Sequence, residues 1–80
     1  GLTPNGDSAN DTYVILGIDQ YPDNTFKVFN RWGNIVYEKS GYQNEWAGTN
    51  QDGEDLPDGT YYVVFVSGER EFATYVDLRR

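Results

Sequence analysis

The sequence predicts an all-β domain folded as a small antiparallel sandwich, and three observations lead to this class. Short apolar or alternating runs recur along the chain, and clusters of Gly, Pro, Asn and Asp separate them. Runs of this kind are typical of short strands joined by turns, roughly five or six of them here. No segment of about ten residues or more has the apolar periodicity of a helix. The chain has 80 residues, which is the size of one domain.

The first half of the chain is expected to hold a first strand and a hairpin. Residues 12–18 (TYVILGI) have the composition of a strand, and Gly17 suggests a bulge near its end. Residues 25–32 alternate in polarity. Gly33 and Asn34 then suit the two central positions of a type II′ turn, because Gly33 accepts positive φ without steric cost. Trp32 would therefore face Ile35 across the hairpin.

The second half is expected to hold loops and two further strands. Residues 40–47 are interpreted as irregular or as a short edge strand, and residues 48–59 as an acidic loop anchored by Leu56. Residues 60–66 (TYYVVFV) are apolar on both faces, which predicts a strand covered on both sides, hence central or at an interface. Residues 71–78 form the last strand.

The predicted core follows from this alternation, because alternate residues of a strand share one face. Aromatic residues make up 16% of the chain, so large side chains are available for a small core. Trp32 is expected near Tyr37 and Trp46. The residues assigned to the core are Phe26, Val28, Trp32, Ile35, Tyr37, Trp46, Tyr61, Val63 and Phe65.

Composition excludes several function classes. The formal net charge is −7, which disfavours binding to nucleic acid or to anionic lipid. The absence of histidine and cysteine removes Ser-His and Cys-His nucleophiles and the usual zinc ligands. No apolar run is long enough to insert directly into a membrane as a helix. The N-terminal residues lack the pattern of a signal peptide, and we expect the chain to be a piece of a longer protein, in which a signal could lie upstream.

Two kinds of binding site are compatible with the residues. Asn5, Asp7, Asn10 and Asp11 supply the oxygen ligands that calcium prefers, and the acids of residues 52–58 could add more. Asn and Asp also cap turns with no ion present, so both interpretations stay open. The seven tyrosines and two tryptophans could include a sugar-stacking platform, although a chain this small needs such rings for its core.

Several short motifs follow one another in order across nearly the whole chain. They are Pro4-Asn5-Gly6-Asp7 with Asn10-Asp11, Asn30-Arg31-Trp32-Gly33, Val36-Tyr37, Gly41-Tyr42, Trp46-x-Gly48, Leu56-Pro57-x-Gly59-Thr60-Tyr61-Tyr62 and a terminal arginine. In this order they resemble the gliding-motility-associated C-terminal domain, the type B C-terminal domain of type IX secretion cargo in Bacteroidota. The chain departs from the family pattern at Ser8-Ala9, at Ala47, and in lacking a Lys-Gly pair in the last strand.

The resemblance implies an immunoglobulin-like antiparallel β-sandwich of about six to seven short strands. It also implies that residues 1–80 are a single secretion and sorting domain, excised from a large surface or adhesin-like protein. Such a domain directs its cargo through the periplasm to the type IX machinery for export and surface attachment. The implied partner is an outer-membrane β-barrel of the SprF type. The implied domain is not an enzyme and needs no cofactor, and we expect it to be monomeric in isolation.

Three arginines are the candidate partner-binding residues. Arg31 is expected to point away from the core beside a tight turn, where it is either read by a partner or paired with Glu38. Arg79 and Arg80 form a basic end on an acidic chain, which either marks the signal or keeps the end soluble. Two other functions stay open: an adhesion module that binds calcium or carbohydrate, and a structural spacer.

Overall fold

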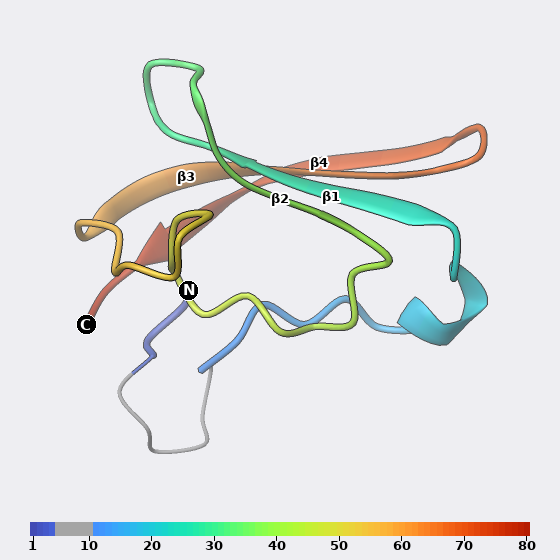
Figure 1. The fold of residues 1–80 in the computed structure, drawn as a ribbon, viewed down its shortest axis with the longest axis horizontal. Helices are drawn as coiled ribbons and strands as arrows, with labels where there is room; N and C mark the ends of the chain where they lie inside the picture. The colour runs from blue at the N-terminus through green and yellow to red at the C-terminus, as the bar shows by residue number, and fades with distance from the viewer. Residues whose placement is uncertain (5–10) are drawn as a thin grey trace.

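The computed structural model describes residues 1–4 and 11–80, and its regular structure is one antiparallel sheet (Figure 1). The strands lie in the order β2-β1-β3-β4. Their bounds are β1 (Asn24–Phe29), β2 (Ile35–Ser40), β3 (Gly59–Ser67) and β4 (Arg70–Leu78). The prediction of an all-β fold is therefore confirmed. The described residues form these four strands rather than six to seven.

Irregular chain covers one face of this sheet in place of a second sheet (Figure 1). The covering layer comes from residues 11–23 and 41–58, and it includes one 3₁₀ helix, η1 (Ile18–Gln20). Residues 40–47 and 48–59 were expected to be largely irregular, and outside the end of β2 and the start of β3 they are. The second layer is held by turns and by side-chain hydrogen bonds, and the described residues show no second strand ladder.

The prediction of a first strand over residues 12–18 is wrong. Tyr13 donates its backbone N–H to the Trp46 carbonyl at 2.9 Å, but Ile15 donates to the side-chain oxygen of Asn44 at 2.8 Å. Asn44 has a φ of 68°, so its own backbone leaves the extended conformation that a strand partner needs. Gly17 forms no bulge; it precedes η1 with a φ of 76°.

The predicted two-residue turn at Gly33-Asn34 is also wrong. Ile35 pairs with Phe29 rather than with Trp32, so five residues connect β1 and β2. The Asn30 side-chain oxygen accepts hydrogen bonds from the backbone N–H groups of Trp32 and Asn34, both at 3.0 Å. These bonds start the turn at Asn30, since an Asn side chain at this place mimics one turn of backbone.

This turn places two predicted core residues on the surface. The connection projects from the sheet on the side away from the irregular layer (Figure 1). Trp32 is 71% exposed and Ile35 is exposed as well, so their assignment to the core is wrong. The expected contacts of Trp32 with Tyr37 and Trp46 do not form. Trp46 itself packs against Tyr37, with ring centroids 6.1 Å apart.

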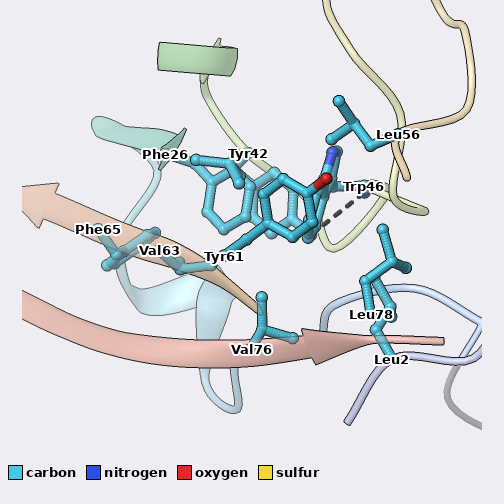
Figure 2. Close-up of a cluster of buried hydrophobic side chains, with 11 residues drawn as sticks. Leu2, Phe26, Tyr42, Trp46, Leu56, Tyr61, Val63, Phe65, Val76 and Leu78 are labelled. Carbon is cyan, nitrogen blue, oxygen red and sulfur yellow. Dashed lines mark hydrogen bonds between the residues drawn. The ribbon is translucent and has the colours of Figure 1, made fainter. Parts of the chain in front are cut away.

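The core lies between the sheet and the irregular layer, and Figure 2 shows its aromatic centre. Phe26 of β1 stacks on Tyr42 with ring centroids 3.8 Å apart. Of the predicted core, Tyr37 is half-buried, and six residues are buried: Phe26, Val28, Trp46, Tyr61, Val63 and Phe65. The buried residues that the alternation did not identify are Leu2, Tyr42, Leu56, Val76 and Leu78.

Asn24 is the buried polar residue that ties the irregular layer to the sheet. Its side-chain amide donates to the carbonyls of Tyr21 and Tyr42, and its side-chain oxygen accepts from the Tyr42 N–H at 2.7 Å. A buried amide is stable only when its hydrogen bonds are made, and here they are. Asn24 thus positions Tyr42, which stacks in the core.

The outer face of the sheet is not covered by other described residues. β3 is central, as predicted, since it lies between β1 and β4. Its outward residues were expected to be buried, yet Tyr62 is exposed and Val64 and Val66 are half-buried. The prediction that this strand is covered on both faces is therefore wrong for the described part of the chain.

Candidate functional site

The exposed tip of the β1–β2 connection is a candidate site built from the Asn30-Arg31-Trp32-Gly33 motif. The Gly33 N–H donates to the Asn30 carbonyl at 3.0 Å, and Gly33 takes a φ of 84°. The guanidinium carbon of Arg31 lies 4.3 Å from the centroid of the Trp32 ring. An arginine over the face of a tryptophan is held by attraction to the ring quadrupole. The tip therefore presents a cation and an indole as one unit.

A second motif lies against this tip. Pro57, Asp58 and residues 59–61 line a pocket of about 200 Å³ together with Asn30, Arg31 and Trp32. The Tyr61 hydroxyl donates to the Pro57 carbonyl at 2.8 Å, which holds the chain entering β3 in place. Motifs that are far apart in the sequence thus form one concave surface with a cation, an acid and aromatic rings.

The predicted Arg31–Glu38 pair does not form. Glu38 lies across from Lys27 in the β1–β2 ladder, and its carboxylate is 4.0 Å from the Lys27 ammonium. The five-residue connection, together with the bulge between Val28 and Phe29, sets a register different from the one that a two-residue turn would give. Arg31 is left on the tip with its contact to Trp32.

Arg80 binds its own chain. Its guanidinium donates to the carbonyls of Leu56 and Gly48, and it lies 3.5 Å from the Asp55 carboxylate and 4.0 Å from that of Asp58. Its side chain is only 24% exposed. Arg80 therefore fastens the acidic loop of residues 48–58 to the end of β4, a role that the sequence reasoning missed. The sequence features that came closest to indicating this role were the acids of that loop and Gly48.

Arg79 differs from Arg80 in its surroundings. Its side chain is well exposed and pairs with Asp77 of β4 at 3.1 Å. Exposed ion pairs of this kind contribute little to stability. Of the three arginines singled out from the sequence, Arg31 and Arg79 are accessible to a partner, and Arg80 is largely engaged within the chain.

The comparison with known families shows which family the chain belongs to. The family model of the CHU_C type IX secretion signal domain matches residues 1–78. The chain belongs to this family. The resemblance seen in the sequence motifs is confirmed, and the chain is an export-targeting domain that interacts with the type IX secretion machinery. No curated protein and no solved structure matched the chain in the other two comparisons.

Family membership also indicates the destination of the exported protein. A type IX secretion signal implies export to the cell surface or the extracellular space. Within residues 1–4 and 11–80, no helix of the secretion signal domain is both long and apolar enough to cross a membrane.

The predicted calcium site stays a prediction. Asn5, Asp7 and Asn10 lie outside the described residues, and of the four only Asp11 is described. Among the described residues, no group of three or more Asp and Glu side chains is arranged to hold a metal ion. In the second acidic loop, Asp55 and Asp58 face Arg80 instead.

The acidic loop of the secretion signal domain repeats the construction of the tip. The Asn50 side-chain oxygen accepts from the N–H groups of Asp52 and Glu54, at 3.0 and 2.9 Å. The Gly53 N–H donates to the Asn50 carbonyl at 3.0 Å, and Gly53 has a φ of 84°. An Asn followed three residues later by Gly therefore specifies the same turn twice, and this spacing was a signal in the sequence for the tip.

Replacing Arg80 with methionine is expected to lower the free energy of unfolding by about 1.5–3 kcal/mol, because the carbonyls of Leu56 and Gly48 lose a charged donor. Arg79→Met, at the exposed neighbour, should change it by less than about 0.5 kcal/mol. Urea unfolding followed by circular dichroism measures both. Equal effects of the two substitutions would contradict the role assigned to Arg80.

Alkaline pH is expected to destabilise the domain through Tyr42. Burial raises the pKa of the Tyr42 hydroxyl well above its ordinary value of 10.0; the nearby Glu45 raises it further, and a backbone hydrogen bond to Trp46 partly opposes the shift. Above about pH 10 the unfolded chain releases this proton while the folded chain keeps it, so stability falls as pH rises. Below that pH the contribution is complete. Urea midpoints measured from pH 8 to 11 should decline only at the alkaline end, and a flat profile would refute the assignment.

Proposed function

We propose that this domain is the non-enzymatic address of a large, adhesin-like surface protein of the Bacteroidota type. In this proposal an outer-membrane β-barrel of the SprF type reads the address in the periplasm, and the cargo is then exported and attached to the surface. The family match supports the export role. The partner, the cargo and the route are the parts that the proposal adds.

The observation that carries the proposal is the Arg31–Trp32 pair at the tip. Trp32 is a large apolar side chain left in solvent, and Arg31 contacts it rather than an acid. Tryptophan and arginine are the side chains most enriched among residues that dominate protein–protein binding energy. The Asn30 hydrogen bonds fix the backbone of the turn that carries both residues before binding, which lowers the entropy lost on association.

The Pro57–Tyr61 side of the pocket complements this pair. Asp58 lines the same pocket as Arg31, so the pocket offers both charge signs together with an aromatic surface. A partner loop with polar groups and one apolar side chain would fit such a surface. We therefore assign recognition to the tip and its pocket, and we assign Arg80 a structural role beside it.

Fusing residues 1–80 to a periplasmic reporter should carry the reporter to the surface of a cell that has the type IX machinery and the matching barrel. Trp32→Ala and Arg31→Ala are each expected to reduce surface reporter by about tenfold or more, as loss of a dominant interface residue does. Lys39→Ala is the matched control, because Lys39 is an exposed cation paired with Glu45 at 3.8 Å.

Urea unfolding of the purified variants separates a loss of recognition from a loss of folding. Purified Trp32→Ala and Arg31→Ala domains should unfold at the same urea concentration as the parent domain. A parent reporter that stays in the periplasm would refute the export role of residues 1–80. Normal export of both tip variants would refute the assignment of the partner site to the tip.

A further inference from the structure

The sheet ends in two edge strands, β2 and β4, and the chain itself covers the edge of β2. The Glu38 N–H donates to the side-chain oxygen of Gln51 at 2.8 Å, and the Gln51 side-chain nitrogen donates to the Glu38 carbonyl at 3.1 Å. One side-chain amide therefore pairs with the middle of β2 as a peptide group of a neighbouring strand would. Unpaired strand edges are templates for pairing with another chain, so this contact protects β2.

The edge of β4 is covered at its C-terminal end by Leu2. The Leu2 N–H donates to the Asp77 carbonyl at 2.8 Å, and the Arg79 N–H donates to the Leu2 carbonyl at 2.9 Å. These two bonds make Leu2 the parallel partner of Leu78. The Leu2 side chain is 1% exposed and belongs to the core. Leu2 is thus bound to β4 as one residue of a parallel strand.

The rest of the β4 edge is open among the residues that the structure describes. Successive residues of a strand direct their N–H and C=O groups to opposite sides. Asp77 binds Leu2 on the edge side, so Tyr75 and Ala73 direct their backbone groups to this side as well. No described residue pairs with them there, apart from a long contact of 3.5 Å between the Thr74 hydroxyl and the Tyr75 carbonyl. This edge has no counterpart of the cap on β2.

The parallel bridge fixes the direction and register of a chain that reaches Gly1 along this edge. Gly1 lies beside Asp77, so the first residue before Gly1 would lie beside Val76. Its N–H would donate to the Tyr75 carbonyl, and its carbonyl would accept from the Asp77 N–H. The third residue before Gly1 would bind Ala73 and Tyr75 in the same way. These are the open backbone groups of β4.

The same register assigns a face to each side chain of such a segment. Parallel partners point to the same face, as Leu2 and Leu78 do in the core. The first and third residues before Gly1 would therefore point to the core side, beside Val76 and Thr74, where apolar side chains are favoured. The second would lie on the outer face beside Tyr75, whose side chain is 64% exposed. The segment would bury apolar surface on both faces of the sheet.

We propose that the segment of the exported protein that immediately precedes Gly1 adds to the β4 edge as a further, parallel strand. A C-terminal export-targeting domain follows its cargo in the chain, so this segment is the connection to the cargo. The proposal rests on that export role and is independent of recognition at the tip. It adds a parallel strand to an otherwise antiparallel sheet, and it closes the second edge.

The direction of the added strand places the cargo away from the tip. A strand parallel to β4 enters beside Arg70, at the β3–β4 turn, and ends beside Leu78. The pocket at the tip is lined by residues 59–61, which pair with the Leu78 end of β4 (Figure 1). The cargo would therefore leave the sheet at the end opposite the pocket and would not cover it.

The test compares the 80-residue domain with the same domain preceded by its native upstream segment, about six residues long. Amide hydrogen exchange is followed by nuclear magnetic resonance. The extension should slow exchange of the Asp77 and Tyr75 amides by about tenfold or more, because each gains a hydrogen bond. The Val76 amide, which faces β3, should be protected equally in both forms.

Proline at two adjacent positions of the extension separates strand addition from loose contact. Proline as the first residue before Gly1 lacks the N–H that would bind the Tyr75 carbonyl. It should return the Asp77 and Tyr75 amides to fast exchange. Proline as the second residue before Gly1 lacks only an N–H that faces away from β4, so the protection should remain.

Three results would overturn the proposal. The first is fast exchange of the Asp77 and Tyr75 amides with the extension in place. The second is an equal effect of the two prolines, because the segment would then not have the register that Leu2 sets. The third is protection that increases with protein concentration, since the edge would then pair with a second copy. None of these results bears on the export of a reporter, so failure here is distinguishable from failure of the proposed function.

Discussion

Replacing Trp46 with alanine is expected to unfold most of the domain, whereas replacing Trp32 with alanine should leave it folded. Trp46 is 1% exposed, its ring packs on Phe26 and Tyr37, and its indole N–H donates to the Thr49 carbonyl at 2.8 Å. Removing a buried tryptophan costs about 3–5 kcal/mol, which approaches the whole stability of a domain of this size.

Trp32 supplies the matched comparison, since it is the same residue type on the surface. Its removal should change the free energy of unfolding by less than about 0.5 kcal/mol. Urea unfolding followed by circular dichroism measures both variants, and Trp46→Phe, which keeps part of the packing, should fall between them. Similar losses at the two positions would mean that Trp32 is buried in solution and would remove the basis for the tip as a recognition site.

Gly48→Ala is expected to destabilise the domain by about 2–4 kcal/mol. Gly48 has a φ of 80°, and an added Cβ would lie 2.8 Å from both a Leu78 methyl carbon and the Arg80 guanidinium. The left-handed conformation costs a residue with a side chain about 1 kcal/mol, and forced overpacking adds about 1–3 kcal/mol. Arg80 would have to release the carbonyls that it binds.

Gly53→Ala isolates the steric part of this effect. Gly53 has nearly the same φ, 84°, but an added Cβ there meets nothing within 4 Å. It should therefore show only the conformational cost of about 1 kcal/mol. Thermal or urea midpoints of the two variants give the difference. Equal destabilisation would mean that the close approach of Gly48 to Leu78 and Arg80 does not matter.

These comparisons also define how an export defect should be interpreted. Trp46, Gly48 and Arg80 belong to the core and to the fastening of the acidic loop, so their variants should lose export together with stability. Trp32 and Arg31 belong to neither, and their variants should lose export alone. The domain thus offers two classes of variant that a secretion assay combined with urea unfolding can tell apart.

Local sequence patterns determined the all-β class, the position of β3 and β4, and the family. Strong alternation in residues 60–66 is sufficient for a strand because each side chain has a defined face once the chain is extended. The motifs also contained the correct turn: Asn30 followed by Gly33 has the same spacing as Asn50 followed by Gly53. The sequence analysis predicted a two-residue Gly33-Asn34 turn instead of the turn that starts at Asn30. This error assigned the exposed Trp32 to the core.

Tertiary structure decided the rest, because each remaining feature depends on residues distant in the sequence. Residues 12–18 have every local property of a strand, but a strand needs an extended neighbour, and Asn44 is not extended. From the sequence, Arg80 is expected to be a free surface charge. Only the fold brings the carbonyls of Leu56 and Gly48 beside its guanidinium. Local sequence sets which face a side chain takes, whereas register and pairing set whether that face is core, edge or solvent.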